Sequence, residues 1–308
     1  MTVITPVFNR RRLIRRALAG VAAQTRQPES VVVIDDASDD GSDEVAREAG
    51  AQVIRLDHNS GPGVARQRGL TWATTPWAAF LDSDDHWAPD HLETLFTAAS
   101  DDLSLIATTA VATTHRGPRL TGNTFHRPLA LRRPADVLRP ENAIWTSAAM
   151  VRVSDALAGG GSPPGRLAED LELWLRVLTR GPGVVLPRIT VQIGLSIDQG
   201  DEGLYRDRAT NASAVFEDMK SATLDLLDRY VAVGVLNERD CAGLRASVTW
   251  DRVRATWTVG HNAEALRSTA PFRSPPMLLG LVSVLASRRA VRRRWRRQKE
   301  RVATLING

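Results

Sequence analysis

The sequence predicts an α/β fold with a mainly parallel sheet, followed by a helical C-terminal region. Short apolar runs rich in β-branched residues alternate with amphipathic helical patterns through roughly the first hundred residues. The content of 43% hydrophobic and 24% charged residues is typical of a globular protein, and 308 residues can bury a full core. Beyond about residue 196 the strand-like runs end and only helical patterns continue.

Four short apolar runs predict the first strands of the sheet. They lie at residues 2–6, 31–34, 53–56 and 77–81. Apolar residues at helical spacing predict helices between them, over residues 10–24, from Ser42 to Gly50, and from Val64 to Ala73. Strands joined by helices of this length form right-handed crossovers, so we expect these four strands to be parallel.

The pattern is looser from residue 101 to residue 195. Two β-prone runs, Leu103–Thr113 and Ile144–Val151, flank a polar segment at 115–142 that we expect to be a loop. A mobile loop rich in glycine and proline is expected at 159–165. It leads into a helix with an apolar face formed by Leu171, Trp174, Leu175 and Leu178.

Two further helices are predicted at residues 205–232 and 237–259. We therefore divide the chain into an α/β domain of residues 1–195 and a mainly helical region of residues 196–308 with a basic tail.

Polar residues follow the ends of three predicted strands. The first strand ends in Pro6-Val7-Phe8-Asn9, the second in Asp35-Asp36, and the fourth in Asp82-Ser83-Asp84-Asp85. Ligands bind beyond the carboxyl ends of such strands. Clustered carboxylates need a compensating charge, and their oxygens suit Mg²⁺ or Mn²⁺, which would leave coordination positions for phosphates. The alternative for the 82–85 cluster is an acidic turn that caps the next helix.

The chain has neither a P-loop nor a G-x-G-x-x-G between strand and helix. Backbone groups therefore do not cradle a phosphate, and metal bridging is the remaining route. Asp36 is placed to accept hydrogen bonds from ribose hydroxyls or base N–H groups.

In order and spacing these segments resemble the family 2 glycosyltransferases of the GT-A fold. The matching segments are Pro6-Val7-Phe8-Asn9, Gln24-Thr25, Val33 to Ser42, Asn59-x-Gly61-x-x-x-Ala65-Arg66 and Leu81-Asp82-Ser83-Asp84-Asp85. The resemblance covers roughly residues 1–195 and implies a Rossmann-like α/β/α sandwich. The sequence lacks the Q-x-x-R-W element of processive polysaccharide synthases.

The resemblance also implies roles for single residues. The nucleotide would contact Pro6, Phe8, Asn9, Asp36, Arg66, Asp82, Ser83 and Asp84. Asp84 and Asp85 would bind the metal. A helix arginine that neutralises neighbouring aspartates is a comparable role for Arg66.

The pair Glu169-Asp170 opens the helix with the Leu-Trp-Leu-Arg segment. Acids in a first turn complement the helix dipole, and that role alone would explain them. The resemblance instead implies catalysis, with Asp170 as the base that deprotonates the acceptor hydroxyl and Glu169 as its alternative. Trp87, Trp145 and Thr146 are assigned to the acceptor side, although core packing ranks first for both tryptophans.

Charge is concentrated near the C-terminus. The stretch from Arg288 to Arg301 carries a net charge of +8, whereas the whole chain carries +5, so the rest of the chain is negative. The run contains a single aromatic residue, Trp295, and no glycine, so nucleic acid is not expected as a partner. The preceding apolar run, 277–286, is about half the length of a membrane span and predicts either a core helix or an interfacial anchor on anionic lipid.

The single cysteine, Cys241, excludes an intramolecular disulfide. A strand directly after Met1 leaves no room for a signal peptide, so we expect a cytoplasmic protein, with possible contact at the inner face of the membrane.

The resulting expectation is a metal-dependent, inverting glycosyltransferase that moves one sugar from a nucleoside diphosphate sugar, first a UDP-sugar, to an acceptor hydroxyl. Bacterial natural-product, cell-envelope or polysaccharide biosynthesis would be its setting. The alternatives are a sugar nucleotidyltransferase on a similar sheet and a non-catalytic module that binds membranes or polyanions.

Overall fold

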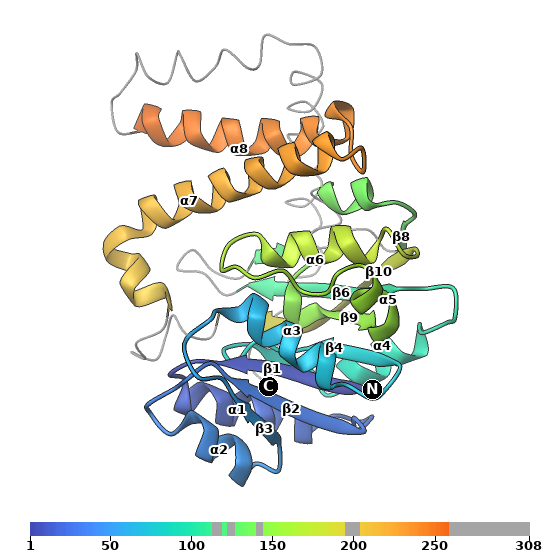
Figure 1. The fold of residues 1–308 in the computed structure, drawn as a ribbon, viewed down its shortest axis with the longest axis vertical. Helices are drawn as coiled ribbons and strands as arrows, with labels where there is room; N and C mark the ends of the chain where they lie inside the picture. Colours follow the sequence, from blue (N-terminus) through green and yellow to red (C-terminus); the bar gives the residue numbers. More distant parts are fainter. Residues whose placement is uncertain (113–118, 122–126, 140–143, 195–203, 259–308) are drawn as a thin grey trace.

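The computed structural model describes residues 1–112, 119–121, 127–139, 144–194 and 204–258. The apolar run at 277–286 and the basic tail, about which the sequence makes predictions, lie outside these residues. Within them, a ten-stranded mixed sheet has the order β3-β2-β1-β4-β9-β6-β10-β5, with β7 beside β6 and β8 beside β10 (Figure 1).

The strands have the following bounds: β1 Thr2–Val7, β2 Ser30–Asp35, β3 Gln52–Arg55, β4 Trp77–Phe80, β5 His86–Trp87, β6 Leu105–Ala112, β7 Arg119–Thr121, β8 Leu129–Leu131, β9 Ala149–Arg152 and β10 Gly183–Ile193. The first four strands are parallel to one another, as their connecting helices predict, and β10 is parallel to β6. Strand β9 is antiparallel to both of its neighbours. The carboxyl ends of β1, β2 and β4 therefore meet at one edge of the sheet.

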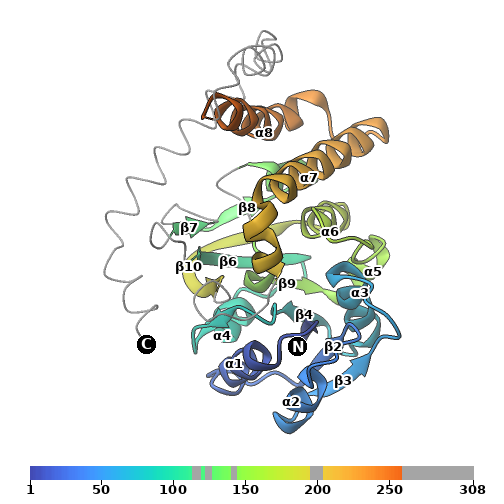
Figure 2. The ribbon, with the colours of Figure 1, turned by 90° about the vertical axis from the view of Figure 1, so that its left-hand side faces the viewer.

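Helices cover both faces of the sheet (Figure 2). On one face lie α1 (Arg11–Ala22), α2 (Ser42–Glu48) and α4 (His91–Thr97), whose apolar residues form two core clusters with the strands. On the other face lie α3 (Pro62–Trp72), α5 (Val153–Ala158) and α6 (Glu169–Val177), which pack in a third cluster. This α/β/α arrangement confirms the predicted fold class.

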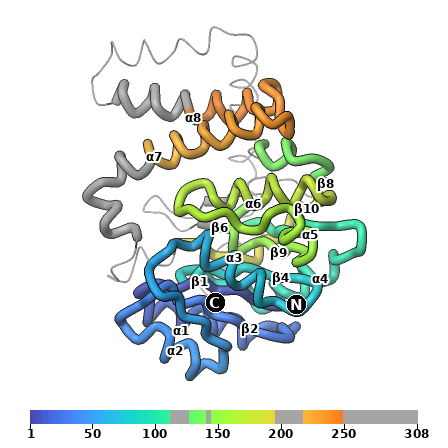
Figure 3. Tube along the Cα trace, in the orientation of Figure 1, coloured from blue at the N-terminus to red at the C-terminus, as the bar shows by residue number. Residues whose placement is uncertain are grey.

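Helices α7 (Leu204–Ala232) and α8 (Glu238–Thr258) follow, and the parts of them that are coloured in Figure 3 lie side by side at one end of the molecule, beyond α6. Leu226, Leu227 and Cys241 belong to the same core cluster as α6 and the sheet. Arg229 Nη2 lies 2.9 Å from Glu172 Oε2, which adds an ion pair between α7 and α6. Among the described residues, no helix is both long and apolar enough to cross a membrane.

Two expectations about local structure are wrong. The segment 115–142 is not all loop, because it includes β7, β8 and the 3₁₀ helix η1 (Pro134–Leu138). Strands of three residues are too short to show an alternating pattern. The run Ile144–Val151 does not begin as a strand: a 3₁₀ turn, η3 (Thr146–Ala148), precedes β9. The turn brings the buried Ser147 hydroxyl to Asp85 and to the backbone N–H of Asp82.

The loop at 159–165, which we expected to be mobile, packs closely on α3. Gln67 Oε1 accepts the Ser162 N–H at 2.8 Å. The backbone of the loop approaches so closely that a Cβ on Gly63 would lie 2.1 Å from the Pro163 carbonyl oxygen. Glycine at position 63 thus permits the contact that fixes the chain leading to Glu169.

Candidate active site

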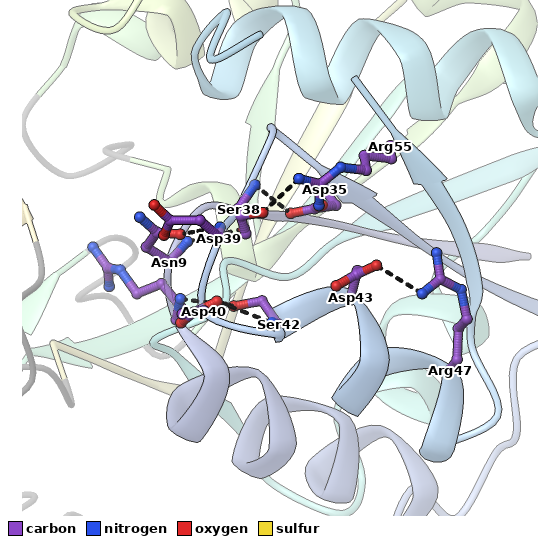
Figure 4. Close-up of polar contacts among 10 residues, drawn as sticks. Asn9, Asp35, Ser38, Asp39, Asp40, Ser42, Asp43, Arg47 and Arg55 are labelled. Atoms are coloured by element: carbon purple, nitrogen blue, oxygen red, sulfur yellow. Dashed lines mark hydrogen bonds and ion pairs between the residues drawn. The ribbon is translucent and has the colours of Figure 1, made fainter. Parts of the chain in front are cut away.

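The acidic loop after β2, residues 35–42, holds the local backbone in place through hydrogen bonds and an ion pair (Figure 4). Asp35 is fully buried and forms an ion pair with Arg55 Nη1, while its Oδ1 accepts the Ser38 N–H at 3.1 Å. Arg55 Nη2 also donates to the Ser38 carbonyl oxygen at 2.6 Å. These bonds compensate the charge of Asp35 without any ligand.

The same loop fixes the start of α1. Asn9 Oδ1 accepts the Asp39 N–H at 2.9 Å, and Ser38 Oγ accepts the Asn9 N–H at 3.0 Å (Figure 4). Asp40 accepts the N–H groups of Arg11 and Ser42, both at 2.9 Å. Asn9 adopts a left-handed backbone with φ of 51°, a conformation that asparagine tolerates better than most residues. Much of the first acidic cluster is therefore structural.

A pocket of about 270 Å³ opens at the carboxyl ends of β1, β2 and β4. Its walls come from segments that are far apart in the sequence. The residues that line it include Pro6, Phe8, Arg10, Asp36, Asn59, Arg66, Asp82, Ser83, Asp84, Asp85, Trp145, Thr146, Arg166, Glu169, Asp170, Ile193, Gly194 and Met219.

Asp36 and Phe8 form one side of the pocket. The Asp36 carboxylate accepts the backbone N–H groups of Ser60 at 2.7 Å and of Gly61 at 2.8 Å. These bonds hold the turn before α3 and leave further lone pairs of the carboxylate for a ligand. Phe8 is 38% exposed and lines the pocket, so its ring offers a surface for a flat group.

The second acidic cluster is tied to η3 and to the end of β10. Asp85 Oδ2 accepts the Ser147 hydroxyl at 2.5 Å, and Oδ1 accepts the Gly194 N–H at 3.3 Å. Burial, together with the charges of Asp84 and Asp82, raises the pKa of Asp85 well above its ordinary value. Asp84 is paired with Arg10, whose Nη1 lies 2.8 Å from Asp84 Oδ2.

Arg66 joins this cluster to α6. Its Nη2 lies 2.8 Å from Asp82 Oδ1 and its Nη1 lies 3.2 Å from Glu169 Oε1. Burial would lower the pKa of Arg66, but the carboxylates of Asp82 and Glu169 raise it above the ordinary value. Without a ligand, Arg66 therefore has the neutralising role that the sequence leaves open beside nucleotide contact.

Asp170 has a different environment from its neighbour Glu169. Its Oδ1 accepts only the adjacent Leu171 N–H, at 2.7 Å, among the hydrogen bonds found for it in the described part of the chain. Burial and the charge of Glu169 raise the pKa of Asp170 to about 6, against the lowering effect of Arg66. A carboxyl with a pKa near neutrality can both accept and release a proton under physiological conditions.

The donor set suits a hard divalent cation. In the part of the chain that the structure describes, no group of three or more His, Cys, Asp or Glu residues is arranged to hold a metal ion. Mg²⁺ and similar ions are commonly bound by one or two carboxylates together with substrate phosphates, and Asp84 and Asp85 can supply these. A cation would also offset the repulsion that burial intensifies at Asp85. The residues present therefore fit a shared protein–substrate site.

Most of the predicted site residues lie together in the pocket, although their roles stay predictions. Asn9 does not line it, because its side chain holds the acidic loop. The assignment of Trp87 to the acceptor side is wrong. Its ring is 1% exposed in a core cluster, and its Nε1 donates to the Ser147 carbonyl oxygen at 2.7 Å. Trp145 and Thr146 do line the pocket.

Sequence reasoning missed several lining residues. Arg10, Arg166 and Met219 were given no role. Arg10 could have been noticed, since it directly follows the Pro6-to-Asn9 segment at the end of β1. The sequence around Met219 carries no motif, and only the packing of α7 brings this residue to the pocket.

A mixed sheet whose strands β1 to β4 are parallel, two helical layers and an acidic edge are the arrangement found in glycosyltransferases of the GT-A fold. The chain belongs to glycosyl transferase family 2, whose model matches residues 2–155. This membership confirms the resemblance found in the sequence and favours a glycosyltransferase over a nucleotidyltransferase.

Curated relatives match only part of the chain. The succinoglycan biosynthesis protein ExoW of Rhizobium meliloti is 44% identical over 100 residues, which cover 30% of this chain and 31% of ExoW. Glycosyltransferase GlyA of Streptococcus pneumoniae is 34% identical over 100 residues, covering 31% of this chain and 14% of GlyA. The chain thus spans a third or less of the length of these two relatives.

Two solved structures share the fold over most of the chain. Residues 1-349 of TarS from S. aureus align with a TM-score of 0.55 and 18% identity, over 96% of this chain and 91% of the 1-349 chain. The mannosyltransferase PcManGT of Pyrobaculum calidifontis, solved with GDP-Man and Mn²⁺, aligns with a TM-score of 0.52 and 17% identity, over 92% and 85% of the two chains. At this identity the likeness shows the fold.

Proposed function

We propose that the chain transfers one sugar from a nucleoside diphosphate sugar to an acceptor hydroxyl, with inversion at the anomeric carbon. One observation carries the proposal: Asp170, with a pKa of about 6, lines the same pocket as the Asp84-Asp85 pair, about 85 residues earlier in the chain. An inverting transfer needs both groups, a base for the incoming hydroxyl and a charged site for the departing diphosphate.

Asp170 is the better base of the two neighbouring acids. Its carboxylate lies in the first turn of α6, where the helix dipole favours negative charge, and it is ionised above pH 6. Glu169 is bound to Arg66, so its oxygens are less free to take a proton. Asp170 accepts the proton of the acceptor hydroxyl as that oxygen attacks the sugar.

The donor lies along the opposite wall in this proposal. Phe8 and Asp36 contact the nucleoside, with Pro6 beside them, and Asp82 and Ser83 lie toward the ribose. The diphosphate is directed to Asp84 and Asp85. Mg²⁺ or Mn²⁺ bound there supplies charge neutralisation for the leaving nucleoside diphosphate. We take a UDP-sugar as the first donor to test; TarS has been solved with UDP and with UDP-GlcNAc.

The acceptor enters on the side of Trp145 and Thr146. Trp145 is partly exposed and can stack on a sugar ring, and Ile193 and Met219 line the same pocket. The name of ExoW refers to succinoglycan biosynthesis, which supports bacterial cell-envelope or polysaccharide biosynthesis as the setting.

The basic tail supports a second element of the proposal, on sequence grounds only. The charge of Arg288 to Arg301 would bring a cytoplasmic enzyme to anionic lipid at the inner face of the membrane.

Release of nucleoside diphosphate from a panel of nucleoside diphosphate sugars tests the proposed reaction. Even without the true acceptor, slow transfer to water is expected from a competent site. Release that requires Mn²⁺ and is lost in Asp170→Asn supports the proposal. No release and no nucleotide binding across UDP-, GDP- and dTDP-sugars contradicts it.

A further inference from the structure

Arg10 is a buried arginine in the pocket wall that none of the roles above uses. Its side chain is 9% exposed, and its Nη1 lies 2.8 Å from Asp84 Oδ2. Asp84 is itself only 18% exposed, so this ion pair is shielded from water. The partner of Arg10 is thus a carboxylate assigned to the metal.

The backbone of Arg10 is firmly held. Its N–H donates to Ser42 Oγ at 2.9 Å, and its carbonyl oxygen accepts the Ile14 N–H at 2.9 Å in the first turn of α1. The Ser42 hydroxyl donates in turn to Asp40 at 2.5 Å (Figure 4). The acidic loop after β2 therefore fixes where the Arg10 side chain starts, while its long side chain keeps rotatable bonds that can redirect the guanidinium.

Two buried arginines line the pocket, and Arg10 is the one of these two that can change partner. Arg66 already bonds Asp82 and Glu169, two carboxylates that keep it in place. Arg10 is bonded to Asp84, where a divalent cation would compete with it. Two positive groups on one carboxylate repel each other strongly in a partly buried site. The guanidinium must then turn to another anion, and the diphosphate next to the metal is that anion.

We propose that Arg10 binds the diphosphate of the donor. Without the donor its guanidinium neutralises Asp84, and when the metal–donor complex binds it moves to the phosphate oxygens, which the planar fork of arginine can bond with two parallel N–H groups. The inference rests on the proposed function, because the diphosphate is that of the nucleoside diphosphate sugar.

Two binding measurements on the full chain test this role, without any sugar transfer. Mn²⁺ alone is titrated and followed by the electron paramagnetic resonance signal of the free ion. UDP, and GDP as a second probe, are then titrated by calorimetry at saturating Mn²⁺. In Arg10→Ala, Mn²⁺ alone binds at least about threefold more tightly, because its competitor for Asp84 is gone. UDP or GDP binds at least about tenfold more weakly, because a charge-assisted hydrogen bond to phosphate is lost.

Arg15→Ala is the matched control. It removes the same charge five residues further along, within α1, but Arg15 is exposed and pairs with Glu48 on the surface. Both affinities in this variant stay within about twofold of the wild type, because solvent and salt screen an exposed charge. A conservative variant, Arg10→Lys, keeps the charge and loses the fork, so its nucleotide affinity falls between those of the wild type and Arg10→Ala.

The inference requires both changes in Arg10→Ala. If nucleotide affinity is unchanged in Arg10→Ala, or if Mn²⁺ affinity is unchanged or weaker, the ion pair with Asp84 is purely structural and the inference is overturned. The proposed function still stands in that case, provided that the wild type binds nucleotide. If Arg10→Ala does not fold, Arg10→Lys decides: weaker nucleotide binding at an unchanged melting temperature supports the role, and unchanged binding overturns it. A wild type that binds neither UDP nor GDP with Mn²⁺ overturns the proposed function and this inference with it.

Discussion

Arg66 Nη1 lies 3.2 Å from Glu169 Oε1, an ion pair between α3 and the first turn of α6. The same guanidinium bonds Asp82, so it links the acid pair of α6 to the acidic cluster after β4. The ion pair with Arg66 gives the two adjacent carboxylates different chemistry. Glu169 is held by the Arg66 guanidinium, whereas Asp170 has a pKa of about 6. Their roles can therefore be separated by mutation.

Asp170→Asn tests the assignment of the base. The amide keeps the size of the side chain and cannot take a proton, so we expect kcat to fall at least about 10²-fold while nucleotide affinity changes only a few-fold. Steady-state kinetics and calorimetry measure the two effects. Glu169→Gln is the matched control, and a comparable loss of kcat in that variant, with Asp170→Asn still active, would transfer the role to Glu169.

The pH profile of kcat is expected to follow Asp170. The base must be ionised, and burial raises its pKa to about 6, so the rate should rise about tenfold per pH unit below that value and level off above pH 7. The residual activity of Asp170→Asn should lack this acid limb. A wild-type rate that is flat between pH 5 and pH 7 argues against the assignment.

Metal dependence is expected through Asp84 and Asp85. EDTA should abolish turnover, and Mn²⁺ or Mg²⁺ should restore it. Asp85→Asn should weaken nucleotide binding in the presence of metal and leave metal-free binding nearly unchanged, which calorimetry with and without Mn²⁺ can show. Full activity of protein that is verified to be metal-free would refute the prediction.

Ser147 should support the same site from η3. Its hydroxyl bonds both Asp85 and the Asp82 N–H, so Ser147→Ala removes a donor from a buried carboxylate and loosens the turn that carries the cluster. We expect weaker Mn²⁺-dependent nucleotide binding and a lower melting temperature. Ser147→Thr retains a hydroxyl and should lose less of both; equal losses in the two variants would point to packing instead of the hydrogen bonds.

His91 should make the fold sensitive to acid. The ring is fully buried, its Nδ1 lies 2.7 Å from Thr190 Oγ1, and burial lowers its pKa to about 3. His91 in the unfolded chain binds a proton near pH 6.5, whereas buried His91 in the folded chain does not. His91 therefore causes no loss of folding free energy above pH 6.5. As the pH falls from 6.5 toward 3, protonation of the unfolded chain lowers the free energy of unfolding by up to about 1.4 kcal/mol per pH unit.

Denaturant unfolding between pH 7.5 and pH 4 measures this loss. His91→Asn should be less stable at pH 7.5, because it leaves space beside Trp87, but its stability should depend less on pH. The exposed His58→Asn is the control and should follow the wild type. Equal slopes for His91→Asn and the wild type would show that other groups cause the acid sensitivity.

The basic tail makes a prediction that depends on the sequence alone. If it contacts anionic lipid, deletion of residues 288–308 should abolish co-sedimentation with anionic vesicles, and salt should weaken binding of the intact chain. Activity on a water-soluble acceptor should not change. Absence of vesicle binding by the intact chain at low salt would end the idea of an anchor.

The sequence was most informative where the pattern is local and periodic. β-branched runs and helical stripes predicted β1 to β4 and the helices between them, because each buries a continuous apolar face. β7 and β8 were missed because a strand of three residues, paired with a longer strand, is too short to show an alternating pattern of polar and apolar residues. The turn η3 was missed because Ser147 is fixed by partners more than sixty residues away.

Site residues were predictable where they form short motifs and not where the fold assembles them. The predicted strand ends placed Asp36 and Asp84 at one edge of the sheet, whereas Asp170 was assigned to the site through the family resemblance. The pairing of Arg10 with Asp84 joins residues 74 positions apart and is visible only in three dimensions. Trp87 stands beside the cluster in sequence, yet strand alternation turns its ring into the core.

Nucleoside diphosphate release, measured for the wild type and for Asp170→Asn with the same donors, tests the central claim most directly. The account predicts Mn²⁺-dependent release from at least one nucleoside diphosphate sugar by the wild type. It also predicts a loss of at least about 10²-fold in Asp170→Asn, with nucleotide binding retained. Equal release by the two proteins, or none by a wild type that binds no nucleotide, would contradict it.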